Sequence, residues 1–192
     1  NWAPPAFIPK DLTAVVLTHA HIDHTGYLPL VVGQGYTGPI YCTAATKDLL
    51  ELLLVDSARL QLEEAQHALK YGTSKHHPPK PLYTEEDVRQ TLKQLRQIPR
   101  DKLTHLLPGV TVEAKCAGHI LGSVILNLEI AGKRITFSGD IGRYDAPILP
   151  DPVGVSVGDL LLCESTYGDR LHAEENPEET LLQALKRASL RN

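Results

Sequence analysis

One stretch decides how this sequence is interpreted: Thr18-His19-Ala20-His21-Ile22-Asp23-His24-Thr25-Gly26. It directly follows residues 13–17, an apolar and β-branched run that is typical of a buried strand. Neutral imidazole and carboxylate groups are ligands of divalent first-row metals such as zinc, and a loop at a strand end can direct several of them inward. The alternatives are a solvated histidine-rich loop or a cap for the next helix. Because polar groups packed behind a buried strand are costly without an ion, the stretch predicts a metal site.

Two later turns each carry one further candidate ligand. His119 lies between glycines in Gly118-His119-Ile120-Leu121-Gly122-Ser123, just before an expected strand. Asp140 lies between glycines in Ser138-Gly139-Asp140-Ile141-Gly142, just after the hairpin partner of that strand. Alone, such a histidine or aspartate is more often structural, but the cluster at 18–26 makes both of them expected ligands. Folding, and not local sequence, would then assemble the site.

The rest of the chain alternates between α and β patterns. Short apolar or alternating runs predict strands at 13–17, 40–42, 110–114, 124–130, 134–138 and 159–164. Helices are predicted at 44–71, from Thr84 to about Ile98, and after Asn176, which would be the N-cap of a capping box completed by Glu179. The apolar face of the first helix would consist of Leu49, Leu50, Leu53, Val55, Leu60 and Leu62. Helices between runs of strands predict an α/β fold with sheet layers covered by helices.

The composition is that of a soluble globular chain, with 192 residues of which 42% are hydrophobic and 22% charged. No apolar run approaches the roughly 20 residues that span a bilayer, so no membrane partner is expected. The net charge of −4 lacks the basic excess usual in nucleic-acid-binding proteins, although bound divalent cations would add positive charge. Cys42, Cys116 and Cys163 are odd in number and widely spaced, which predicts buried, unpaired thiols in a reducing cytoplasm.

The pattern His-x-His-x-Asp-His, with the later Gly-His and Ser-Gly-Asp, resembles the metallo-β-lactamase fold. Residues 163–170, Cys-Glu-Ser-Thr-Tyr-Gly-Asp-Arg, resemble the Glu-Ser-Thr-Tyr-Gly signature of the β-CASP nucleases. That group includes the nuclease subunit of the cleavage and polyadenylation factor and its bacterial and archaeal relatives. The segments 25–29 and 119–123 are also similar to it. The resemblance implies an αββα sandwich with a dinuclear metal site at one sheet edge.

The resemblance also implies a role for each candidate residue. His19, His21 and His119 would hold one metal ion, and Asp23 and His24 a second, with Asp140 bridging the two. Glu164 would lie outside the ligand set and hold a catalytic histidine from a C-terminal segment. With Asp23, Asp140 and Glu164 as catalytic residues, the two divalent ions, expected to be zinc, would supply a hydroxide that hydrolyses RNA phosphodiester bonds.

Compared with the family it resembles, the chain is expected to be a fragment. It starts without Met, after the family's first strands, and ends before most of the β-CASP insertion and the C-terminal return. Residues 1–172 would form a partial metallo-β-lactamase domain, and residues 173–192 the start of the insertion or a connecting helix. The second metal site would then be weakened by a missing histidine. The sequence leaves open whether the chain forms a homo-oligomer.

Two rival functions share the histidine cluster: a thioester or lactone hydrolase on the same scaffold, and a non-catalytic scaffold relative. The first is not expected to carry the segment 164–168, and the second is disfavoured because every ligand expected in this region is intact. Near the expected cleft, Arg143, Arg170 and His172 are candidate substrate contacts. The remaining histidines are expected to be solvated or packing residues: His67, His76, His77 and His105.

Overall fold

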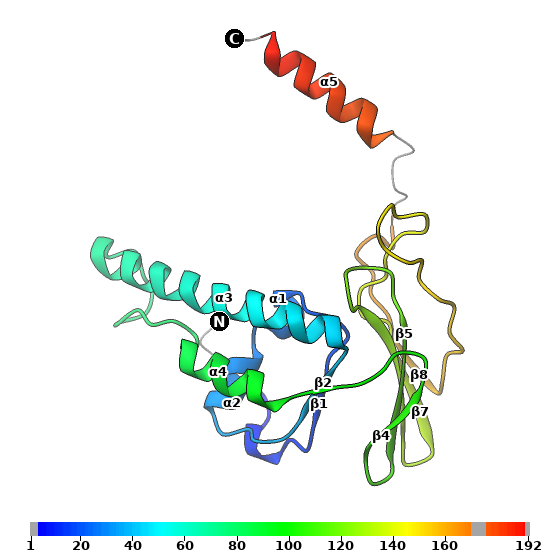
Figure 1. Cartoon of the computed structure of the whole chain (residues 1–192). Coiled ribbons are helices and arrows are strands. Elements are labelled where there is room, and N and C mark those ends of the chain that lie inside the picture. Colours follow the sequence, from blue (N-terminus) through cyan, green and yellow to red (C-terminus); the bar gives the residue numbers. More distant parts are fainter. Residues whose placement is uncertain (1–3, 170–175, 191–192) are drawn as a thin grey trace.

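The computed structural model describes residues 4–169 and 176–190, and its elements form layers (Figure 1). The first sheet has three parallel strands in the order β1-β2-β3. These are β1 (Val15–Val16), β2 (Ile40–Cys42) and β3 (Leu95–Gln97). The helices associated with this sheet are α1 (Ile22–Thr25), α2 (Leu28–Gly33), α3 (Ala44–Tyr71) and α4 (Glu85–Gln94), preceded by the short 3-10 helix η1 (Pro9–Asp11).

The second sheet has five strands in chain order, antiparallel except for the last pair, which is parallel. Its strands are β4 (Leu103–Leu107), β5 (Val110–Cys116), β6 (Val124–Ile130), β7 (Lys133–Phe137) and β8 (Leu160–Leu162). The last helix, α5 (Pro177–Ser189), lies apart from both sheets in Figure 1.

Two hydrophobic cores hold the layers together. The larger core joins the helices to the first sheet and includes Ile40, Leu50, Leu54 and Val88, all fully buried. The second core joins the two sheets: Val112 and Val124 of the five-stranded sheet pack with partly buried side chains of β1 and β2. The described elements therefore supply three layers, helix on sheet on sheet, of the expected sandwich.

The predicted elements are largely confirmed, with two corrections in the first half. The helix expected from Thr84 to about Ile98 ends at Gln94, because Leu95 turns into an extended conformation and pairs with Ile40 of β2. The apolar face of α3 is narrower than predicted. Leu50 is buried, together with Leu54 and Ala58, whereas Val55, Leu60 and Leu62 are exposed.

The C-terminal part needs three more corrections. The strand expected at 159–164 is present as β8, but the side chains of its three residues are exposed. Cys163, which follows it, is exposed, whereas Cys42 and Cys116 are buried thiols as predicted. At α5 the Asn176 side chain accepts from the amide of Glu178, so it is a simple N-cap and not the expected box with Glu179.

The topology brings four chain segments to one edge of the two sheets. β5 and β7 both pair antiparallel with β6, so they run in the same direction, and β8 runs parallel to β7. The segments that follow these three strands therefore lie at the same end of the second sheet. The loop after β1 joins them there, because the amide of Val124 donates to the Thr18 carbonyl (2.9 Å). Candidate ligands from residues 19–24, 119 and 140 thus meet at this edge.

Candidate metal centre

His19 is the buried centre of the cluster, with a side chain that is 0% exposed. Its Nδ1 lies 3.1 Å from the Thr18 hydroxyl, a contact that orients the ring and leaves Nε2 free to face the other histidines. Burial, and then the neighbouring His24, lower the pKa of His19 to about 4. The imidazole is therefore neutral at pH 7, as a metal ligand must be.

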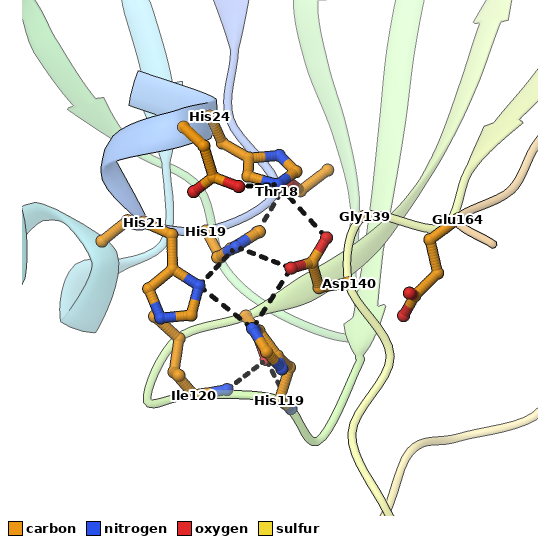
Figure 2. A network of polar contacts seen from close by, with 12 residues as sticks. Thr18, His19, His21, His24, His119, Ile120, Gly139, Asp140 and Glu164 are labelled. Carbon is orange, nitrogen blue, oxygen red and sulfur yellow. Dashed lines mark hydrogen bonds and ion pairs between the residues drawn. The ribbon is translucent and has the colours of Figure 1, made fainter. Parts of the chain in front are cut away.

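Four of the predicted ligand side chains, those of His19, His21, His119 and Asp140, converge on one another (Figure 2). His21 Nδ1 lies 3.1 Å from His19 Nε2 and 3.1 Å from His119 Nε2. Asp140 Oδ2 completes the group at 3.4 Å from His119 Nε2 and 3.7 Å from His19 Nε2. These four ligand atoms all lie within 4.8 Å of one another.

The three imidazole nitrogens and the carboxylate oxygen are spaced to bind one divalent ion. Zinc binds imidazole nitrogen at about 2.0–2.1 Å with tetrahedral geometry, so two of its ligand atoms are separated by roughly 3.3 Å. The observed separations of 3.1, 3.4 and 3.7 Å among His19, His21, His119 and Asp140 bracket that value. Nitrogen lone pairs held this close repel unless a proton or a cation lies between them. A divalent cation enclosed by these four side chains would satisfy all of their ligand atoms at once.

A second, more open group lies on the other side of Asp140. Asp140 Oδ1 is 3.2 Å from His24 Nε2, while Oδ2 of the same carboxylate faces His19 and His119. Asp23 Oδ2 is 3.5 Å from His24 Nε2, but its side chain is 76% exposed. Asp23 and His24 thus lie outside the compact four-residue group, and Asp140 directs one oxygen toward each side. This orientation is what a bridging carboxylate requires.

The turn that carries His119 is held by groups that the sequence analysis did not identify. The Ser123 hydroxyl accepts hydrogen bonds from the amides of His119 (3.0 Å) and Ile120 (3.2 Å). The Gly122 carbonyl accepts from the buried hydroxyls of Thr43 (2.7 Å) and Thr46 (3.2 Å) at the start of α3. The serine after a glycine turn is a local signal that could have been found. The threonine contacts are long-range and have no such signal.

Gly122 is required at this contact. Its φ of +83° is unfavourable for a residue with a side chain, and a Cβ would lie 2.7 Å from the Thr43 hydroxyl. The glycine allows α3 and the His119 turn to approach closely. The first turn of α3 therefore helps to fix the position of a candidate metal ligand.

Glu164 lies beyond Asp140 and apart from the histidines (Figure 2). Its Oε1 accepts a hydrogen bond of 2.6 Å from the amide of Ile141, the residue after Asp140. That bond, and contacts with Thr166, lower the pKa of the Glu164 carboxyl. The amide of Glu164 donates to the Ser138 hydroxyl at 3.0 Å, so Glu164 is joined to both sides of Asp140. Within the described residues its carboxylate supports the Asp140 loop.

The metallo-β-lactamase superfamily model matches residues 5–184, which is most of the chain. The chain belongs to this superfamily. Curated relatives confirm the narrower resemblance to RNA-processing nucleases of the β-CASP group. Ribonuclease TTHA0252 of Thermus thermophilus is 37% identical over 172 residues, which are 90% of this chain and 36% of the relative. Transcription termination factor FttA of Cenarchaeum symbiosum is 37% identical over 82% of this chain and 23% of the relative.

A fungal relative is also similar over most of this chain but only over a small part of its own length. Endoribonuclease ysh-1 of Neurospora crassa is 34% identical over 94% of this metallo-β-lactamase chain and 21% of its own length. The chain thus spans about a third or less of these three relatives. Among solved structures, Zn(2+)-bound PqqB from Methylobacterium extorquens has a TM-score of 0.41 and 16% identity, covering 71% of this chain and 37% of the other.

Of the other predicted candidates, only Arg143 lies beside the metallo-β-lactamase centre within the described residues. His67 packs against Tyr71 on α3, with ring centroids 4.4 Å apart. His76, His77 and His105 are exposed, as expected for solvated side chains. Arg143 lines a cavity next to His119 and Asp140. Arg170 and His172 lie outside the described residues. No described helix is both long enough and apolar enough to span a bilayer.

Proposed function

We propose that this chain carries the metal centre of a hydrolase that cleaves RNA phosphodiester bonds. The observation that carries the proposal is the convergence of His19, His21, His119 and Asp140 within 4.8 Å. It occurs in a metallo-β-lactamase chain whose relatives include proteins named ribonuclease and endoribonuclease. RNA is accordingly the proposed substrate, and the centre itself would supply the positive charge that the net charge of −4 does not.

The proposed centre holds two divalent ions, and its imidazole ligands favour zinc. His19, His21 and His119 would hold the first, Asp23 and His24 the second, with Asp140 shared between them. The opposed directions of the two Asp140 oxygens support this division. Two divalent ions held by these residues would lower the pKa of a water molecule and neutralise charge that develops on a phosphodiester.

The protein's own residues would orient this chemistry. Neutral His19 offers its Nε2 lone pair at pH 7 without first losing a proton, because burial keeps its pKa at about 4. The bond from the Ile141 amide to Glu164 anchors the loop that carries Asp140. Asp23, with its exposed carboxylate, is the ligand most accessible to substrate. Asp23, Asp140 and Glu164 are therefore the proposed catalytic and supporting carboxylates.

The proposed organisation places the metallo-β-lactamase part at residues 1–172 and a connecting helix or the start of an insertion at 173–192. The described side chains of α5 support the second assignment, since all of them are exposed. We further propose that the protein works in the cytoplasm, where its three cysteines, free in the structure, remain reduced.

The competing thioester or lactone hydrolase can be tested with the full-length gene product. End-labelled RNA and a generic thioester are offered separately to the zinc-loaded protein, with and without a chelator. We expect chelator-sensitive RNA cleavage and negligible thioester hydrolysis. Faster turnover of the thioester would favour the alternative enzyme. A lack of turnover on both substrates, with metal bound, would favour a non-catalytic relative.

A further inference from the structure

A cavity of about 350 Å³ opens beside the metal centre. His119 and Asp140 form the side of the cavity that faces the centre, and Arg143, Glu164 and Tyr167 are among its other lining residues. Its volume lies in the range of about 300–1,000 Å³ typical of small-ligand sites. A group bound in this cavity would therefore touch the two ligand-bearing turns directly.

The backbone that leads to Arg143 is held firmly. The amide of Gly142 donates to the Ala117 carbonyl at 2.8 Å, and a Cβ at Gly142 would overlap the backbone of Gly118. The preceding Ile141 amide is bonded to Glu164. The Asp140 loop is thus closely packed against the turn that carries His119, and Arg143 projects from a fixed base only three positions after Asp140.

Among the described residues that line this cavity, Arg143 is a charged side chain without an ion-pair partner. Its side chain is exposed, and no carboxylate in the described part of the chain forms an ion pair with it. The two carboxylates that line the cavity are already engaged. Asp140 contacts the histidines, and Glu164 accepts from the Ile141 amide. A guanidinium is always charged, and its forked donors match the oxygens of a phosphate.

We propose that Arg143 binds a backbone phosphate of the RNA adjacent to the one at the metal centre. This inference rests on the proposed function and specifies how the substrate is held. A phosphate contact fixes the position of the strand without selecting its sequence. Arg143 is therefore a positioning residue that places the scissile bond beside Asp140 and His119, with its neighbouring phosphate in the cavity.

The test compares Arg143→Gln with the matched control Arg100→Gln in the full-length gene product. Arg100 is also exposed and has no ion pair with a described residue, but the cavity that it lines, which adjoins the first at Gly118 and Leu149, includes neither His119 nor Asp140. RNA binding is measured by fluorescence anisotropy after chelator treatment, which prevents cleavage, over a range of salt concentrations. KM and kcat are then measured for the zinc-loaded protein.

We expect Arg143→Gln to weaken RNA binding by about tenfold for every sequence tested and to reduce the salt slope of log K by about 0.7. It should raise KM more than it lowers kcat. Arg143→Lys should retain the salt slope, because it keeps the charge, but bind more weakly than wild type. Arg100→Gln should behave as wild type.

If Arg143→Gln binds RNA with the affinity and salt slope of the wild type, and the wild-type protein cleaves RNA, this inference is overturned while the proposed function stands. An equal loss in Arg100→Gln would also overturn it, because the effect would then be one of general charge. Failure of the wild-type protein to bind or cleave any RNA would overturn the proposed function together with this inference. The outcomes therefore separate the two claims.

Discussion

The hydrogen bond between Thr43 and Gly122 predicts that a residue outside the ligand set controls metal affinity. Thr43 caps α3 by accepting from the Thr46 amide, and its hydroxyl donates to the Gly122 carbonyl at 2.7 Å. Thr43→Val removes both contacts and keeps the shape of the side chain. We expect it to weaken zinc binding because the turn that carries His119 loses its support from the helix.

The magnitude follows from the two lost contacts. Loss of the N-cap costs about 1 kcal/mol of unfolding free energy, and loss of the bond to Gly122 about 1 kcal/mol more. The total is therefore about 2 kcal/mol. Changes to residues that support metal ligands cost roughly 10–100-fold in metal affinity. Because Thr46 remains at 3.2 Å from the same carbonyl, we expect the lower end of this range, about tenfold.

Thr84→Val provides a matched control. Thr84 caps α4 through a capping box with Asp87, and the contacts described for it do not involve a candidate metal ligand. Zinc affinity is measured by competition with a chromophoric chelator, and stability by denaturant unfolding of the metal-free proteins. Thr43→Val should lose both stability and zinc affinity. Thr84→Val should lose stability but keep its zinc affinity. Thr43→Ser should keep both. Equal stability losses with unchanged zinc affinity in both valine variants would refute the reasoning.

Three further predictions concern the centre itself. Glu164→Gln should lower RNA turnover by about tenfold at unchanged metal content, and loss of a metal equivalent would instead make Glu164 a ligand. Zinc titration of the metal-free chain should show one tight and one weak equivalent, because Asp23 is far more exposed than the ligands of the first group; two equally tight equivalents would contradict this. The metal-free chain should lose at most about 3 kcal/mol of stability as pH falls from 6.5 toward 4. The unfolded chain binds a proton on His19 in that range and the folded chain does not, so His19→Asn should remove this pH dependence in unfolding experiments.

Elements with strong local patterns were predictable from the sequence. The strand at 40–42 and the helix at 44–71 have the predicted bounds, because a short apolar run and a helical apolar face are local signals. The segment Leu95–Gln97 was predicted as helix because it continues a helical pattern. It is a strand because β2 offers an unpaired edge, which is a non-local cause. The exposure of the β8 side chains likewise could not be inferred from its apolar sequence.

The candidate site likewise combines features that are local in the sequence with features that depend on the fold. The spacing of His19, His21 and His24 is local, and it predicts a metal site without any knowledge of the fold. His119 and Asp140 were expected to join it only once the cluster was known, and sheet topology brings them there. The bond from Thr43 to Gly122 joins residues 79 positions apart, so no local pattern could predict it. The candidate ligands were therefore readable from the sequence, whereas the contacts that support them were not.

The claim that this centre cleaves RNA can be tested by one rate measurement. Cleavage of labelled RNA by the full-length gene product is followed after chelation and again after zinc is restored, in the wild type and in Asp140→Ala. Circular dichroism confirms that both proteins remain folded. We predict that wild-type cleavage stops on chelation and returns with zinc, while Asp140→Ala cleaves in neither condition. Cleavage at the wild-type rate by Asp140→Ala, or by the metal-free protein, would contradict the proposed site and its function.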